Sequence, residues 1–140
     1  MILSVLEEIA GAATCVYNPV AVLPTDGAGT LTLQCTWSGS GGAEHVTYVV
    51  TVSTGLSGTY AAGAMASGAN TLTYNLYTDA ARTQIWGNGA AGTSVWNGNM
   101  NVSNGQPVRT ATAIDYGRIP SGQDAAAGAY SDTITVTVNF

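Results

Sequence analysis

The residues that could do chemistry in this 140-residue chain are few and scattered. His45 is the only histidine, and neither a Gly-x-Ser-x-Gly nucleophile motif nor a His-Glu-x-x-His zinc motif accompanies it. The eight carboxylates form no recognisable pair for hydrolysis. We therefore expect no catalytic residue, no metal ion, no cofactor and no enzymatic activity, and we interpret His45 as a surface residue at the end of a strand.

One glycine-rich segment formally matches a nucleotide-binding pattern. Residues Gly87–Gly92 read Gly-Asn-Gly-Ala-Ala-Gly, but that motif binds dinucleotides only where it joins a strand to a helix. Here it leads into another strand-like run, Thr93-Ser-Val-Trp96. The segment is better interpreted as a hairpin loop.

Two cysteines, Cys15 and Cys35, could form a disulfide bond. Each lies in a strand-like context, and no Cys-x-x-Cys pair or further ligand suggests zinc. Closing a loop of this length would stabilise the fold by about 3 kcal/mol, and it would indicate an oxidising compartment. We favour the disulfide; the alternative is a pair of buried free thiols.

The charge of the chain excludes two classes of partner. Only 8% of residues are charged, the formal net charge is −5, and the basic residues are three arginines with no lysine. Nucleic-acid binding needs clustered Lys and Arg to neutralise phosphates, and anionic lipid needs the same. No apolar run approaches the roughly 18 residues of a membrane helix, so we expect no membrane insertion. Met1 to Ala13 does not have the form of a signal peptide.

The elements that carry these residues are predicted to be strands. Alternation of apolar and polar residues with period two is typical of half-buried strands in antiparallel sheets. It occurs over Thr30–Trp37, His45–Thr54, Asn70–Thr78 and Asp132–Phe140. Gln84–Trp86 is a further short strand, Ser94–Val102 could contain another, and Val108–Ile119 is a longer extended segment. Turn-forming stretches such as Pro24–Gly27 and Gly55–Gly58 separate them. The pattern indicates one all-β domain, an antiparallel sandwich or barrel.

Helix is nearly absent from the predicted elements. Ile2–Ala10 is the one candidate, because Ile2, Val5, Leu6 and Ile9 fall on one helical stripe. Asp79 and Arg82 are three residues apart and could pair across a turn. The three tryptophans, Trp37, Trp86 and Trp96, could form a sugar-binding platform, but packing in the core is the preferred interpretation.

Four pieces of the chain, in this order, are typical of one protein family. They are the cysteine pair Cys15 and Cys35, the segment Leu72–Thr83 followed by Trp86-Gly87, the segment Tyr116-Gly-Arg-Ile-Pro120, and the closing segment Gly128–Phe140. Over roughly Ala13 to Phe140 the chain resembles the spore coat protein U domain, the subunit family of archaic chaperone–usher pili. The resemblance implies an incomplete immunoglobulin-like antiparallel β-sandwich that lacks its last strand.

The resemblance also implies a mode of assembly. An N-terminal extension from a neighbouring subunit, the donor strand, fills the groove of the incomplete sandwich; such a strand satisfies both an unpaired edge and an apolar surface. The C-terminal strand borders that groove, so Ile134, Val136, Val138 and Phe140 are expected to line it. Partners would be copies of this chain or related pilins, and a periplasmic chaperone and an outer-membrane usher during assembly.

Residues 1–11 are the expected donor extension, and residues 12–140 the domain. Leu3, Val5 and Ile9 share one parity and are the expected donor residues, although Glu7 interrupts them. The alternatives are a trimmed N-terminus or a helical tail outside the domain. The protein would then be secreted through the periplasm into an extracellular fibre for adhesion and biofilm formation.

Two other functions stay open at this point. The first is a tip adhesin or binding module that uses the loops Gly55–Ser67 or Gly87–Gly98, with Leu56, Tyr60, Met65 and Trp96 available as apolar contacts. The second is a structural protein of a spore coat or envelope that never forms pili.

Overall fold

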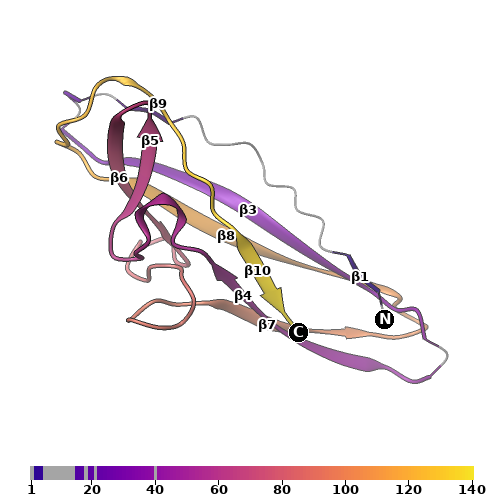
Figure 1. Ribbon diagram of the computed structural model, residues 1–140. Coiled ribbons are helices and arrows are strands. Elements are labelled where there is room, and N and C mark those ends of the chain that lie inside the picture. The colour runs from indigo at the N-terminus through magenta and orange to yellow at the C-terminus, as the bar shows by residue number, and fades with distance from the viewer. Residues whose placement is uncertain (1, 5–14, 18, 21, 40) are drawn as a thin grey trace.

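The longest elements of the protein are two strands that pair along their whole length. The computed structural model describes residues 2–4, 15–17, 19–20, 22–39 and 41–140, with side chains from residue 19 onward. Strand β3 (Thr25–Thr36) pairs antiparallel with β8 (Val108–Ile119), from Thr25 opposite Ile119 to Thr36 opposite Val108. Figure 1 shows these two strands running the length of the molecule.

The strands form two main sheets and a small third one. The five-stranded sheet has the order β1-β3-β8-β6-β5, and the three-stranded sheet has the order β10-β4-β7. β2 pairs with β9 apart from both. The remaining bounds are β1 (Ile2–Ser4), β2 (Cys15–Tyr17), β4 (Glu44–Val52), β5 (Gly63–Ser67), β6 (Asn70–Tyr77), β7 (Trp96–Val102), β9 (Gly128–Tyr130) and β10 (Val136–Asn139).

The core lies between the two main sheets. Its larger cluster takes alternate residues of β3, β4, β7 and β8, because in a strand only every second side chain faces the partner sheet. A smaller cluster joins Met65, Leu72, Tyr74 and Ile119 with Ala125 and Tyr130 at one end of the sandwich. Leu76 and Ile134 pack against both clusters and make them continuous.

The predicted all-β antiparallel class is confirmed, and so is the inward face of most predicted strands. Leu31, Leu33 and Cys35 are buried in β3, and the even-numbered residues from Val46 to Val52 are buried in β4. The predicted turn at Pro24–Gly27 is wrong, because Thr25 to Gly27 already pair with Gly117 to Ile119 of β8. Cross-strand pairing has overridden the local preference of glycine for turns.

Two strands had no clear signal in the sequence. β5 has the sequence Gly-Ala-Met-Ala-Ser and β9 has Gly-Ala-Tyr, so both consist mainly of residues that are poor strand formers. They form because neighbours are available, namely β6 for β5 and β2 for β9.

Helical structure is confined to a short 3-10 turn, η1 (Gly55–Ser57), within the described residues. The predicted helix over Ile2–Ala10 is wrong for Ile2–Ser4, which form a strand, and its remainder lies outside the described residues. In the part of the chain that the structure describes, no helix is both long and apolar enough to cross a membrane.

Candidate functional site

The C-terminal strand β10 occupies an edge of the three-stranded sheet. It pairs antiparallel with β4, from Val136 opposite Val52 to Asn139 opposite Val49. Among the described residues its other edge has no partner strand. An unpaired edge leaves a row of backbone N–H and C=O groups available to another chain. Figure 1 shows β10 in yellow beside β4, at the end of the chain.

The apolar face of this strand is only half covered. Ile134, Val136 and Val138 pack against the larger core cluster but are half-buried, whereas Val50 on the neighbouring strand is 0% exposed. Phe140 follows on the same parity and is 64% exposed. The predicted alternation is therefore confirmed for Ile134, Val136 and Val138, and the surface beside the free edge is apolar.

The expected donor residues are placed only in part. Leu3 lies in β1, where Ile2–Ser4 pair antiparallel with Gln34–Thr36 of the same chain. Val5 and Ile9 lie outside the described residues. Within the single chain, then, the described part of the N-terminus lies on the edge of β3, in the sheet opposite β10. The donor role of Leu3, Val5 and Ile9 stays a prediction.

The two cysteines lie on different strands. Cys15 is in β2, opposite Tyr130, and Cys35 is in β3, opposite Arg109. Cys35 has a buried free thiol, and burial raises the pKa of that thiol. The side chain of Cys15 is outside the described part of the structure. The disulfide between them is not confirmed and stays a prediction.

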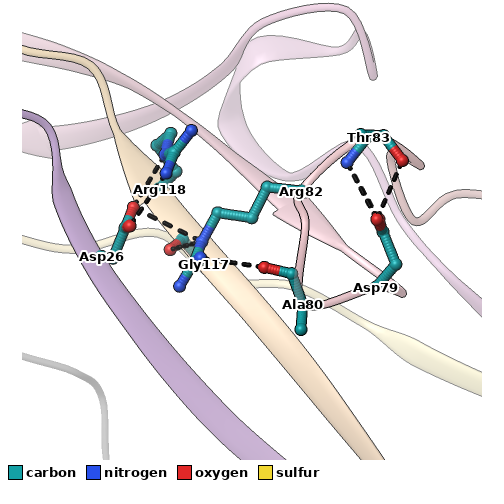
Figure 2. Close-up of polar contacts among 7 residues, drawn as sticks. All are labelled: Asp26, Asp79, Ala80, Arg82, Thr83, Gly117 and Arg118. Carbon is teal, nitrogen blue, oxygen red and sulfur yellow. Dashed lines mark hydrogen bonds and ion pairs between the residues drawn. The ribbon is translucent and has the colours of Figure 1, made fainter.

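Two of the sequence segments singled out above meet at one carboxylate. The Arg118 guanidinium binds Asp26 by two hydrogen bonds, and Arg82 Nε lies 3.4 Å from Asp26 Oδ1 (Figure 2). Arg82 also donates to the carbonyl of Gly117 at 3.3 Å and lies over the Tyr116 ring. Arg82 thus holds the turn after β6 against the β3–β8 pair, and Arg118 links the two strands of that pair.

Asp79 and Arg82 are joined across the turn by their backbones, because the Arg82 N–H donates to the Asp79 carbonyl at 3.0 Å, but their side chains bind different partners. The Asp79 carboxylate accepts hydrogen bonds from the backbone N–H groups of Thr83 and Gln84 and from the Thr83 hydroxyl. Figure 2 shows the side chains of Asp79 and Arg82 pointing to different partners. A carboxylate that closes a turn onto its own backbone satisfies otherwise unpaired donors, which is why aspartate is frequent at such positions.

The family is decided by comparison with known proteins. The family model described as the Spore Coat Protein U domain matches residues 10–137 of the chain. This chain belongs to the Spore Coat Protein U domain family. A curated relative, Protein U of Myxococcus xanthus, is 34% identical in a match 137 residues long, and the match covers 89% of this chain and 68% of the relative.

The Spore Coat Protein U domain described here is also similar to a chain in a solved complex from Acinetobacter baumannii. That complex joins the chaperone CsuC and the tip adhesion subunit CsuE of archaic chaperone–usher Csu pili before assembly. The match has 21% sequence identity and a TM-score of 0.44, and it covers 85% of this chain but 40% of the solved one.

The tryptophans of this Spore Coat Protein U domain serve the core, as predicted. Trp86 is buried, and its indole Nε1 donates to the carbonyl of Val50 at 3.2 Å. Trp37 and Trp96 pack partly buried against the same cluster, and Trp96 contacts Tyr48 at 5.2 Å between ring centroids. The hydrogen bond and the burial together explain why Trp is stable at position 86.

The loops considered for an adhesin present little apolar surface. Leu56 is 58% exposed, but Met65 is 7% exposed and lies in β5. The Tyr60 hydroxyl donates to the carbonyl of Val52 at 2.7 Å, which turns that ring onto the core. The expectation that Met65 stands in a solvent-exposed loop is therefore wrong.

The two remaining candidates for chemistry are His45 and the glycine-rich segment Gly87–Gly92. His45 Nδ1 lies 2.6 Å from Asn101 Oδ1 on the surface of the β4–β7 pair. Gly87–Gly92 form a loop in which Gly89 and Gly92 have positive φ. The bridge that flanks this loop, Trp86 with Ser94, is parallel, so the loop does not close the antiparallel hairpin that the sequence predicts. No group of three or more potential metal ligands occurs among the described residues.

Sequence reasoning missed Asp26 and Asp132. Asp26 pairs with Arg118, which is 92 positions away, and Asp132 contacts segments 58 and 76 positions away. Neither aspartate has a local sequence signal, because most of its partners come from distant segments that only the fold brings close.

Proposed function

We propose that this Spore Coat Protein U domain is a structural subunit that polymerises by donor-strand complementation into an extracellular fibre of the chaperone–usher type. Residues 1–11 of one subunit pair with the free edge of β10 in the next, and the apolar donor residues cover the half-buried face beside it. One observation carries the proposal: among the described residues, the C-terminal strand has no partner on one edge, and its apolar face is incompletely covered, unlike the buried face of β4 beside it.

The physical argument concerns the cost of leaving that strand as it is. Burying apolar surface stabilises a protein by about 25 cal/mol for each Å² removed from water, so the exposed part of this face is a source of binding free energy. An unpaired strand edge can also pair with a strand of another chain. An added strand satisfies the backbone groups and the apolar side chains in one step. In this proposal Ile2–Ser4 leave β3 of their own chain when the fibre forms. Before assembly a periplasmic chaperone covers the same edge, and an outer-membrane usher exports the subunit.

The amino-acid composition supports an extracellular location. With 8% charged residues and no lysine, the surface is built from Thr, Ser, Asn and Gly. The predicted disulfide between Cys15 and Cys35 belongs to the same proposal, because disulfides persist in oxidising compartments. Adhesion and biofilm formation are then properties of the fibre, and no step of the proposal needs a metal ion, a cofactor or catalysis.

The decisive experiment is electrophoresis of fibres in detergent, with and without heating. We expect a ladder of multimers that collapses to monomer only on heating. Deletion of residues 1–11 should abolish the ladder. If the shortened chain still forms heat-sensitive multimers, the donor assignment to residues 1–11 is wrong.

A pair of substitutions at the end of β10 tests the groove itself. Phe140→Lys changes a side chain that is 64% exposed in the single chain, so the free energy of unfolding should change by less than about 0.5 kcal/mol. Assembly should nevertheless fail, because a charge would then lie where donor residues must pack. Asn139→Lys is the matched control on the opposite face, and its fibres should form normally. Equal assembly of both variants would remove Phe140 from the groove.

A further inference from the structure

The segment between β9 and β10 changes sheets, and this crossing decides where the C-terminal strand begins. Ser131 exchanges two backbone hydrogen bonds with Ala66 of β5, at 2.8 and 3.0 Å. Four residues later, the carbonyl of Thr135 accepts a hydrogen bond from the Ser53 N–H at 2.9 Å, directly after β4. β5 and β4 belong to different sheets, so residues 131–135 bridge the sandwich.

A single carboxylate gathers donors from three segments at this crossing. Asp132 Oδ1 accepts from the backbone N–H of Leu56, at 2.9 Å, and from that of Thr133, at 2.7 Å. Asp132 Oδ2 accepts from the Tyr74 hydroxyl at 2.7 Å. The donors come from η1, from β6 and from the crossing segment itself. Asp132 therefore connects the crossing segment to η1 and to β6.

The surroundings leave the crossing segment little freedom to shift. Gly55 has a φ of +59°, and a Cβ built there would overlap the Asp132 carboxylate and lie 2.7 Å from Ile134 Cδ1. Ile134 packs against both core clusters. Ser53 Oγ accepts from the Thr135 N–H at 2.9 Å, next to the backbone bond described above. Each contact depends on the present position of residues 132–135.

The register of β10 has large consequences for its exposed edge. Side chains alternate along a strand, so a slip by one residue would turn Thr135 and Thr137 inward and Val136 and Val138 to solvent. A slip by two would keep the faces but break both contacts of Thr135 with Ser53. We infer that Asp132 is a positioning residue whose carboxylate fixes the sheet crossing, and thereby the register in which β10 presents its free edge to a partner strand.

This inference rests on the proposed function for the role of the edge, but not for the position of the strand. Hydrogen–deuterium exchange of the full-length chain reads that position directly. In Asp132→Ala the peptide covering residues 133–139 should exchange at least about tenfold faster than in the wild type, since local opening controls exchange there. Exchange in β3 and β8 should stay unchanged.

Three further variants distinguish positioning by the Asp132 side chain from an effect of its charge and from a general loss of stability. Asp132→Asn keeps an acceptor oxygen for Leu56 and Thr133, so exchange of residues 133–139 should stay within about threefold of wild type. Tyr74→Phe removes one donor and leaves the carboxylate in place; it gives a local, smaller increase, and it keeps the test available if Asp132→Ala fails to fold. Asp124→Ala removes an exposed aspartate outside the crossing segment and should change nothing.

The outcomes distinguish the two proposals. If wild type forms heat-sensitive multimers, Asp132→Ala should form them at least about tenfold more slowly, and Asp132→Asn should restore the rate. If wild type does not polymerise but exchange rises locally in Asp132→Ala, the fibre proposal fails and the role of Asp132 stands. Unchanged exchange in residues 133–139, or an equal rise throughout the sandwich, would overturn the inference.

Discussion

The guanidinium of Arg118 binds the carboxylate of Asp26 at both oxygens, with Nε 2.7 Å from Oδ1 and Nη2 2.9 Å from Oδ2. The two residues lie directly opposite each other in the β3–β8 pair. Parallel hydrogen bonds between charged groups are among the stronger polar contacts, and the arginine holds the pKa of Asp26 below its ordinary value.

The pairing of Asp26 predicts an acid-dependent loss of stability. A lowered pKa in the folded state means that the unfolded chain takes up the proton first, so the contribution is present above pH 3.8 and is lost as the pH falls through the lower folded value. Asp26→Asn should therefore lower the thermal midpoint at pH 7. The difference from wild type should shrink as the pH falls below 3.8, and a difference that stays constant across the whole range would contradict this account. Asp124→Asn is the control.

The raised pKa of Tyr74 predicts a loss of stability at alkaline pH. Burial, and then the hydrogen bond and charge of Asp132, raise the pKa of Tyr74 above its ordinary value of 10.0. The unfolded chain then loses the proton first, so stability falls as the pH rises above 10. Denaturant unfolding should show a shallower fall in Tyr74→Phe. A residual fall is expected from Tyr48, whose pKa burial also raises; identical slopes for wild type and Tyr74→Phe would exclude Tyr74 as a cause.

Alanine substitutions at a core leucine and at a loop leucine should differ in their effect on the free energy of unfolding. Leu72 is 1% exposed at the centre of the smaller cluster, so Leu72→Ala should cost about 2–5 kcal/mol in the free energy of unfolding. Leu56 is exposed in η1, and Leu56→Ala should cost less than about 0.5 kcal/mol. Urea unfolding measures both values. Similar costs at the two positions would contradict the assigned packing.

Thiol labelling tests the predicted disulfide. Cys35 is buried, so an alkylating reagent should not reach it in the folded chain whatever its redox state. In denaturant without reductant, a disulfide between Cys15 and Cys35 leaves both sulfurs unlabelled, and reductant then exposes two thiols. Labelling of both cysteines in denaturant alone, with protein taken from an oxidising compartment, would exclude the disulfide.

A matched variant measures what the disulfide contributes. Cys15→Ser should lower the free energy of unfolding by about 3 kcal/mol under oxidising conditions. Under reducing conditions its stability should equal that of wild type, apart from the effect of the serine itself. An equal loss under both conditions would assign the effect to packing.

Strand content and inward faces were readable from the sequence because they depend on neighbours in the chain. In β4 the period-two pattern predicted the bounds to within two residues, and β8 has the bounds of the predicted extended segment. The same holds for the alternation in the C-terminal segment, where Ile134, Val136 and Val138 face the core. The family resemblance was also carried by local segments, which the family match over residues 10–137 confirms.

Only the tertiary structure decided how distant segments meet. The fold brings Asp26 to Arg82 and Arg118, which lie on other segments of the chain. It also sets where the chain crosses from one sheet to the other at Asp132. These contacts join residues far apart in the chain, and their free energy depends on pairing and burial in three dimensions, which no local pattern of residues encodes.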